Sequence, residues 1–599
     1  MIKKLLFISA LVFLISHCIA QQTFNELNAN NINCSVTATG DLFNRFQSDL
    51  LAGFEVPAGS DLRTIYAANL WVAGIYNAET FFVSAETYQL VGHDWFTGPL
   101  SIDGNATVST AAMEAYNQVW EANTSDIEIH MSYFQSLQDG TTAELFPDGY
   151  EIPAWIVEWP VHGNTSENQA YILSQFYDNN DDGTYTPEAG DYPLFCGDEC
   201  LYFIFNDKGG VHTESGGFPT GLEIHGMLYA FNSTNNDMLG NTVFLRYEII
   251  NRGTYTLSET YVGLWADFDI GNATDDYVGT NVKRSAVYGY NGDGQDEANS
   301  NSPGYQDDIP MQALQILAGP VMDENLEDDM LPDMVYSSET NSYGAFAFGF
   351  GDGIVDNERL GLSSSLYYNN GINPISGEPG LPIDFFNYLR HTWKDGSICK
   401  HGGNGVSGAG VEEYESTYFF PDESDPLHLG TDGLEASLWN EVTATNPSGD
   451  RRMLGTCGPF ELLPGEINFL DAAFVFAQVG SLNISVEELM DERLKEAKLF
   501  WNENLENCEF QSISLEVEKP LAQFISIYPN PAKDILSIST PTAWNNVSLE
   551  LYDVRGNLIR SISISGGINQ ISVEDLSAGT YAVKVQCGDH LLTQKIIVQ

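Results

Sequence analysis

The seven residues DNNDDGT, from Asp178 to Thr184, have the side chains and spacing of a calcium-binding loop. Oxygen donors stand at the first, third and fifth positions, Asp178, Asn180 and Asp182, and the Thr184 carbonyl supplies the seventh. An EF-hand would need glutamate at the twelfth position, which is Ala189, and flanking helices, where proline-containing segments look extended instead. We therefore expect a helix-free calcium loop; the alternative is a solvated turn rich in Asn and Asp.

A second acidic segment contains Asp267, Asp269 and Asp275. Asp267 and Asp269 are two residues apart, so they share one face at the end of a predicted strand, and the following loop brings back further oxygen donors. We expect a second calcium site here, with a hydrogen-bonded loop as the alternative. Two other acidic loops, residues 291–297 and 352–358, are predicted to be solvated turns.

Two histidine–glutamate pairs offer a different metal chemistry. His212 with Glu214, and Glu223 with His225, each place two polar side chains on one strand face, and the glycine-containing segment between them could fold the pairs together. Two His and two Glu would suit zinc or another transition metal. The alternative is a polar cross-strand network in a hairpin, which is the more common outcome for such clusters.

Sequence signatures of catalysis are missing from the chain. There is no Gly-x-Ser-x-Gly elbow, no His-Glu-x-x-His and no Walker loop, so no catalytic residue is assigned. Paired carboxylates for glycoside hydrolysis remain open, because a chain with 83 acidic residues always offers pairs.

Apolar segments separated by Asn, Asp and Gly clusters run through residues 21–508. Five of them are the clearest strand candidates: Leu201–Phe205, Thr242–Ile250, Thr260–Trp265, Met311–Leu317 and Ile467–Ala477. Ser485 and Glu488 form a capping box for one predicted helix that ends near Leu505. Long loops are expected near residues 290–310, 350–375 and 400–412. The body is thus predicted to be mainly β and sandwich-like, as one unit or two packed units.

The chain is strongly acidic, with 83 Asp and Glu against 24 Lys and Arg and a formal net charge of −59. Nearly all of the excess lies in residues 21–523. Such a surface repels nucleic acid and anionic membranes, so no nucleic-acid partner is expected. It suits cations, and it also favours solubility in a saline medium.

Residues 1–20 have the pattern of a secretory signal peptide. Lys3 and Lys4 precede an apolar run from Leu5 to Ile15, and small residues precede Gln21. The apolar run is too short to span a bilayer, and no other membrane-length stretch follows. We therefore expect no membrane span in the mature form.

Residues 524–599 alternate short apolar runs with turn residues, the pattern of a small Ig-like antiparallel β-sandwich. Four motifs punctuate the segment: Tyr528-Pro529-Asn530-Pro531, Asp553-Val-Arg-Gly556, Leu576-Ser-Ala-Gly579-Thr-Tyr581 and Lys595-Ile-Ile-Val598. In this order they closely resemble the type A C-terminal sorting domain of the type IX secretion system of Bacteroidota. The resemblance implies recognition by that machinery, transit through the periplasm and release or surface attachment. A polar linker, residues 509–523, would expose a cleavage site.

Six cysteines lie in the body, an even number in a chain expected to be exported, so up to three disulfides are predicted. Cys196 and Cys200, four residues apart, are predicted to close a tight disulfide loop. A metal site is the alternative, but no second Cys or His pair stands nearby.

Segments of the body also resemble a large family of exported Bacteroidota proteins. These segments are Glu55–Ser60, Ala67–Trp71, Asp94–Leu100, His212–Gly217, Gly221–Gly226, Asp450–Arg452 and Cys457–Glu461. That family lacks an established activity, so the resemblance strengthens the expectation of export and supplies no mechanism.

Together these patterns predict an exported β protein, calcium-stabilised and non-catalytic, with an adhesive or glycan-binding role and an extracellular glycan or surface ligand as partner. The alternative is a secreted polysaccharide hydrolase.

Overall fold

The computed structural model divides the chain into two compact units, Met1–Phe510 and Gln511–Gln599. The structure describes residues 23–44, 53–76, 80–88, 92–235, 237–300, 302–322, 325–332, 340, 342–406 and 410–505 of the first unit. In the second it describes residues 526–528, 532–533, 535–540, 547–553, 558–565, 567–573, 576–577, 579–587 and 590–598. The predicted signal peptide and linker lie outside these ranges.

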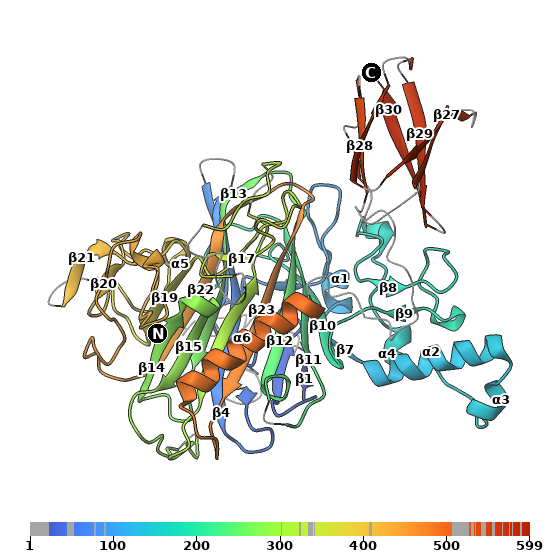
Figure 1. Cartoon of the computed structure of the whole chain (residues 1–599). Helices are drawn as coiled ribbons and strands as arrows, with labels where there is room; N and C mark the ends of the chain where they lie inside the picture. Colours follow the sequence, from blue (N-terminus) through green and yellow to red (C-terminus); the bar gives the residue numbers. More distant parts are fainter. Residues whose placement is uncertain are drawn as a thin grey trace, which may run out of the picture. The chain divides into compact units, whose positions relative to one another are not determined.

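Two large antiparallel sheets form the centre of the first unit, and four two-stranded sheets accompany them among its described residues (Figure 1). The larger, nine-stranded sheet runs in the order β14 (Asp276–Asn281), β15 (Ala286–Asn291), β16 (Met311–Ala318), β23 (Ile467–Ala477), β12 (Thr242–Asn251), β11 (Leu222–Ala230), β10 (Glu199–Asn206) and β6 (Phe96–Thr97), with β7 (Trp120–Asn123) also on β10. The smaller, six-stranded sheet runs β19 (Ser364–Asn369), β22 (Arg451–Leu462), β13 (Leu257–Phe268), β4 (Arg63–Tyr76) and β3 (Phe54–Glu55), with β5 (Thr80–Ala85) also on β4. All five predicted strands are confirmed.

The main apolar core lies between these sheets. Strand β23 shows how the sequence produces it: Phe474 faces the six-stranded sheet, with its ring 6.1 Å from that of Phe54, whereas its neighbours Ala473 and Val475 face the opposite side. Because side chains alternate across a strand, a nearly continuous apolar run buries both faces. The sequence prediction of strands buried on both faces is therefore confirmed for β23.

Helix α6 (Val486–Asn504) covers the outer face of the nine-stranded sheet (Figure 1). The Ser485 hydroxyl accepts the Glu488 N–H at 3.2 Å, which satisfies one of the free donors of the first turn. Leu494 and Trp501 are fully buried on the face that contacts the sheet. The predicted helix is thus confirmed, including its N-terminal cap.

The outer face of the six-stranded sheet is covered by helix α5 (Pro382–Leu389) and by loops. Phe385 of α5 packs edge-on against Trp71 of β4 at 4.9 Å, and Trp71 stacks on Trp265 of β13 at 6.1 Å. These aromatic contacts fix α5 over the sheet and leave the ends of β13 and β22 beside it.

Several helices and strands lie in segments where the sequence predicted a loop or where no element was predicted. Helix α2 (Thr124–Asp139) was not expected, because it buries few apolar side chains, and strand β19 lies inside the predicted loop 350–375. The other elements are α1 (Thr110–Ala115), α3 (Thr142–Leu145), α4 (Ala154–Val157), β1 (Phe24–Leu27), β2 (Cys34–Thr37), β8 (Phe176–Tyr177), β9 (Tyr192–Pro193), β17 (Phe346–Phe348), β18 (Arg359–Leu360), β20 (Lys400–Gly402) and β21 (Val411–Glu415).

The predicted Cys196–Cys200 disulfide is wrong. Cys200 is a free, buried thiol, as are Cys34, Cys399 and Cys457, so the six body cysteines do not form three disulfides. Strand β10 already begins at Glu199, and Cys200 lies opposite Tyr229 and Ala122 in the sheet. An extended, doubly paired strand cannot also make the tight turn that a four-residue disulfide loop requires.

The second unit is a small β-sandwich, as predicted. One sheet has the order β24 (Ser526–Tyr528), β25 (Ile535–Thr540) and β28 (Gly567–Ser572). The other has the order β27 (Leu558–Ile564), β26 (Val547–Asp553), β29 (Gly579–Cys587) and β30 (His590–Val598). Tyr528, Asp553, Gly579 and Tyr581 of the sorting motifs lie on its strands, and the Tyr581 hydroxyl donates to the Ser577 carbonyl at 2.7 Å. Pro529, Asn530, Pro531 and Gly556 lie outside the described residues.

In the described part of the chain, no helix is both long enough and apolar enough to cross a membrane.

Candidate functional site

A pocket of about 760 Å³ opens on the outer face of the six-stranded sheet, next to α5. Five acids line it, Glu214, Asp267, Asp269, Glu378 and Asp450, together with one base, Arg452, and three aromatic residues, Tyr66, Tyr88 and Phe385. We call it the acidic pocket. Three of the segments by which the body resembles exported proteins contribute to it or to its floor: Ala67–Trp71, His212–Gly217 and Asp450–Arg452.

Strand alternation and register explain why Asp267 faces this pocket. Leu264 and Phe268 of β13 point into the core, so Trp265 and Asp267 point the other way. Asp267 is the direct cross-strand partner of Arg452 on β22. Asp269 follows the end of β13, and its backbone N–H donates to the Thr64 carbonyl at 3.0 Å, which holds it beside the strand end.

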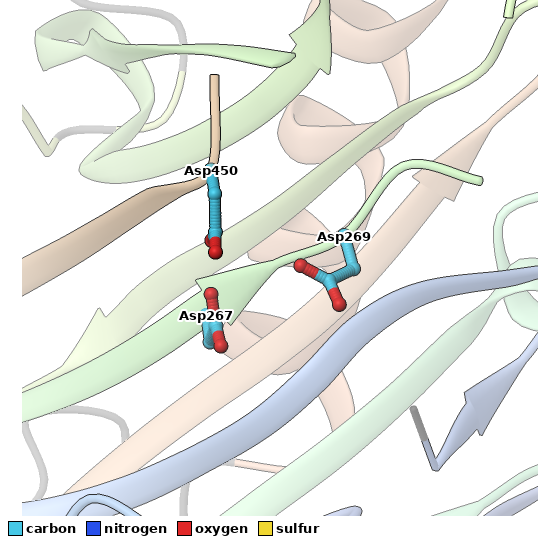
Figure 2. A group of neighbouring side chains, drawn as sticks. All are labelled: Asp267, Asp269 and Asp450. Atoms are coloured by element: carbon cyan, nitrogen blue, oxygen red, sulfur yellow. The ribbon is translucent and has the colours of Figure 1, made fainter. Parts of the chain in front are cut away.

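Asp267, Asp269 and Asp450 form a compact carboxylate group, the acid triad (Figure 2). Each offers an oxygen, and these oxygens lie within 4.8 Å of one another. The Asp267 and Asp450 carboxyl groups face each other, with that of Asp269 beside them (Figure 2). Over the described ranges, no other set of three or more His, Cys, Asp or Glu side chains gathers this closely.

Arg452 is the centre of the hydrogen bonds in the pocket. Its Nη2 lies 3.1 Å from Asp267 Oδ2, its Nε lies 3.2 Å from Glu378 Oε1 and 2.7 Å from the Tyr88 hydroxyl, and its Nη1 contacts Asp450. The Tyr88 hydroxyl in turn donates to Asp267 Oδ2 at 2.8 Å. One guanidinium therefore serves three carboxylates and cannot neutralise them all.

One oxygen of this network has no partner. Asp267 is 3% exposed, and its Oδ1 is buried without a hydrogen-bond donor, although its Oδ2 has two. A buried, unsatisfied carboxylate oxygen costs about 1–3 kcal/mol, and more when it is charged. A cation beside Oδ1 would remove that cost.

The pKa values of the acids in the pocket also indicate a shortage of positive charge. Burial raises the pKa of Asp267 to about 7, against the lowering effect of Arg452. Burial and the neighbouring Asp267 raise the pKa of Asp269 well above its ordinary value. Burial also raises the pKa of Glu214, to about 7, and that of Glu378. Without a ligand, the pocket thus disfavours the full set of negative charges that it contains.

Clustered carboxylate oxygens of this kind suit a hard divalent cation, because calcium, magnesium and manganese prefer oxygen ligands. They suit a glycosidase less well, because its two carboxyl groups stand about 5–5.5 Å or about 6.5–9.5 Å apart to act on a sugar between them. In the acid triad, one oxygen of each carboxyl group lies within 4.8 Å of an oxygen of the other two, an arrangement that suits a shared cation.

Asp275, predicted to share a calcium with Asp267 and Asp269, is not in the acid triad. The acids that raise its pKa are Asp296, Glu297 and Asp293, which belong to another loop. The chain turns away at Gly271, so the predicted acidic segment divides between two places.

The loop from Asp178 to Thr184 is exposed and forms hydrogen bonds within itself. Asp178 accepts the N–H groups of Asn180, Asp182 and Gly183, and Asp182 accepts that of Thr184 at 2.8 Å. These bonds lower the pKa of Asp178. Asp191 closes the loop by accepting the N–H groups of residues 179 and 186 at 2.9 and 2.7 Å. Calcium binding by this loop stays a prediction.

The two histidine–glutamate pairs do not meet. Both ring nitrogens of His212 face backbone carbonyl oxygens, those of Val83 at 2.8 Å and Asp207 at 2.7 Å, so neither nitrogen is open to a metal. The segment around His212 is not a strand, so it cannot form the hairpin face that the sequence suggested.

His225 and Glu223 face each other on β11, at 2.9 Å between Nε2 and Oε1, and Arg252 binds the same glutamate oxygen at 2.7 Å. Glu214 lines the acidic pocket instead, and its Oε1 accepts the Thr87 N–H at 2.9 Å. The four side chains therefore form a polar network and part of the pocket, not one metal centre.

Sequence reasoning missed Asp450, Arg452 and Glu378. Asp450 lies more than 180 residues after Asp267, and only the pairing of β13 with β22 brings the two together. The only signal for it was the resemblance of the segment Asp450–Arg452 to exported proteins.

Comparison with known protein families finds a match in the C-terminal unit. Residues 526–599 match the family described as the secretion system C-terminal sorting domain. An endo-acting ulvan lyase of Formosa agariphila is 34% identical over 76 residues, which are 12% of this chain and 14% of the lyase. The alignment thus spans a small part of either protein.

Two solved structures align with much of the chain at low identity. A polysaccharide lyase aligns with 63% of this chain and 34% of its own, at 7% identity and a TM-score of 0.17. The surface component PorZ of the type IX secretion system of Porphyromonas gingivalis aligns with 72% of this chain and 48% of its own, at 10% identity and a TM-score of 0.11. Such low scores do not establish a shared fold for the body.

The C-terminal unit is identified by its motifs, by its sandwich of seven strands and by the family match. A sorting domain of this kind directs the chain to the cell surface or the extracellular space. Residues 526–599 are a type IX secretion system C-terminal sorting domain of type A, and the chain that bears them is a cargo of that pathway.

Proposed function

We propose that the exported body is a non-catalytic binding protein whose acidic pocket holds calcium through Asp267, Asp269 and Asp450 and takes a neutral glycan. The observation that carries the proposal is the Asp267 Oδ1 atom, which is buried and has no donor although Asp267 belongs to the acid triad. Calcium would supply the missing positive charge and satisfy that oxygen. The Asp178–Thr184 loop is the second place where we propose calcium, in a structural role.

The walls of the pocket support a sugar as the ligand. Tyr66, Tyr88 and Phe385 offer aromatic surface, and a volume of about 760 Å³ is in the range of ligand sites. Carboxylates and the Arg452 guanidinium can accept and donate hydrogen bonds to hydroxyl groups. The excess of acids would repel sulfated or uronic acid chains, so a neutral glycan is the chemistry that fits.

Hydrolysis of polysaccharide is the second candidate. It is favoured by Asp267 and Glu214, whose pKa values of about 7 would keep a carboxyl group protonated near neutral pH, as a general acid requires. The acid triad argues against it, because its arrangement suits a shared cation. The two candidates differ in an observable way, because only a hydrolase releases new reducing ends.

The test is a calcium titration of the full chain by calorimetry, with the Asp267→Asn variant and the matched control Asp148→Asn. Asp148 is exposed, so the control makes the same charge change away from the pocket. We expect the variant to lose one bound calcium per chain and the control to lose none. Binding to neutral glycans should then require calcium and Asp267, without release of reducing ends. Equal calcium binding by the wild type and Asp267→Asn would overturn the proposal.

A further inference from the structure

Asp276 and Asn291 are direct cross-strand partners at the open end of the β14–β15 hairpin. Partners of this kind project their side chains to the same side of the sheet. Val278 and Val287 share that side, and both are fully buried in the core between the sheets. The Asp276 carboxylate and the Asn291 amide therefore point toward the interior, where they are 0% and 7% exposed.

Each of these side chains has one oxygen without a partner. Asp276 Oδ2 accepts the Ile270 N–H at 2.9 Å, but Oδ1 is buried without a donor. Asn291 Nδ2 donates to the carbonyls of Asp293 and Gln295 at 3.3 and 3.1 Å. Because only a nitrogen can donate to carbonyls, the amide orientation is settled, and its Oδ1 is the atom left buried and unpartnered.

Asp275 contributes a third such atom, since its Oδ1 is also buried without a donor. Its backbone lies beside Asn291, because the Gly292 N–H donates to the Asp275 carbonyl at 2.7 Å. A Cβ at position 292 would stand 2.5 Å from that carbonyl oxygen, so this approach requires glycine. Three residues at the open end of the hairpin thus each carry one buried side-chain oxygen without a donor.

Among the described residues, the charged groups that shift the pKa values of Asp275 and Asp276 are all acids. Burial and Asp296 raise the pKa of Asp275 to about 6, and burial, Asp269 and Asp275 raise that of Asp276 well above its ordinary value. Both oxygens of the Asp296 carboxylate already have hydrogen-bond donors, because one accepts the Asn272 N–H at 2.9 Å and the other accepts the Tyr305 N–H.

The arginine next to this region is also engaged. Gly449 N–H donates to the Asp276 carbonyl at 3.0 Å, and Arg451, two residues later, is bound to Glu441 through two nitrogens, each at 3.1 Å. Carboxylates that are buried without a cation are unfavourable, so either protons or a bound cation must offset their charge.

We infer that the side-chain oxygens of Asp275, Asp276 and Asn291 form a separate binding site for a hard divalent cation, calcium. Two carboxylates and an amide carbonyl are ligands that calcium accepts. This site shares no ligand with the acid triad, although Asp269 of the triad is close enough to raise the pKa of Asp276.

Equilibrium dialysis of the full chain against calcium tests the inference, with variants Asp276→Asn and Asp307→Asn. Asp307 is exposed in a neighbouring loop and is a matched control for charge. We expect Asp276→Asn to bind one calcium fewer per chain, or to bind it at least ten-fold more weakly, and Asp307→Asn to match the wild type. Unchanged calcium binding by a folded, more stable Asp276→Asn protein would show a protonated carboxyl and overturn the inference.

A second variant covers the case in which Asp276→Asn does not fold. Asn291→Ala removes the amide oxygen and keeps both carboxylates, so it should bind calcium more weakly than the wild type. Unchanged affinity would overturn the inference. Asp267→Asn separates the two proposals: it should remove the pocket ion and leave the hairpin ion, and a double variant should lose both.

Discussion

Asp267 and Arg452 are cross-strand partners whose side chains are joined at 3.1 Å, and yet the second oxygen of the same aspartate has no donor. Arg452 also binds Glu378 and Asp450, so its single charge is divided among three acids. The pocket is thus built with less positive charge than its carboxylates require. A cation in the pocket would complete this balance.

Arg452→Ala should destabilise the protein strongly in a chelator, by about 3–5 kcal/mol, because it leaves buried carboxylates without their partner. Calcium should restore part of this loss, since it would replace the missing charge. Urea unfolding with and without calcium measures both effects. Arg390→Ala is the control, because Arg390 is exposed and lies over Phe386 outside the pocket. A loss of equal size in calcium and in chelator would contradict the charge argument.

The stability of the calcium-free chain should fall as pH rises from about 4 to about 7 through the contribution of Asp267. The folded pKa of about 7 lies above the unfolded value of about 3.9, so the folded state binds more protons in this window. The contribution is therefore fully present below pH 4 and is lost as pH rises through 7.

Calcium should flatten this dependence, because a bound cation favours the ionised carboxyl groups. Thermal unfolding at several pH values, in chelator and in calcium, gives the comparison. Asp267→Asn should remove most of the difference between the two conditions. Parallel pH profiles in the two conditions would argue against a cation at Asp267.

Asp178→Asn tests whether the exposed loop, residues 178–184, binds calcium or is a solvated turn. The amide keeps one oxygen, which can accept the N–H groups of Asn180 and Asp182 as Oδ1 does, but it replaces the oxygen that accepts the Gly183 N–H and removes the charge that calcium needs. We expect calcium to protect residues 178–186 from proteolysis in the wild type and not in the variant. Protection in neither protein would mean that the loop is a solvated turn, and protection in both would mean that the Asp178 charge does not hold the ion. Asp148→Asn again serves as the control.

The free cysteines give a test of the corrected disulfide prediction. Cys34, Cys200, Cys399 and Cys457 are buried, and burial raises their pKa values, so they should not react with a thiol reagent in the native protein. In guanidinium chloride, at least four thiols per chain should react. Fewer than four would restore the case for a disulfide that includes one of them.

The sequence predicted those parts of the structure that depend on local pattern. Strand β23 is an apolar run, α6 begins with a capping serine, and the sorting domain has motifs in a fixed order. Asp267 and Asp269 could be paired because two residues along a strand return to one face. Asp450 could not be added to them, because its position depends on the register of β13 against β22.

The same limit explains the mistaken expectations. Cys196 and Cys200 are near in sequence, but β10 fixes Cys200 in a sheet. His212 and His225 share a spacing pattern, but backbone carbonyls bind both nitrogens of His212. Asp275 follows Asp269 closely, but the turn at Gly271 carries it to the β14–β15 hairpin. In each case long-range pairing decided the outcome.

Calcium titration of the full wild-type chain beside Asp267→Asn is the most direct measurement of the central claim. We predict that calcium raises the melting temperature of the wild type by an amount that grows with its concentration, as expected for an ion that binds only the folded state. The increase should be smaller in Asp267→Asn and unchanged in Asp148→Asn. The same increase in all three proteins would contradict the claim that Asp267 is a calcium ligand.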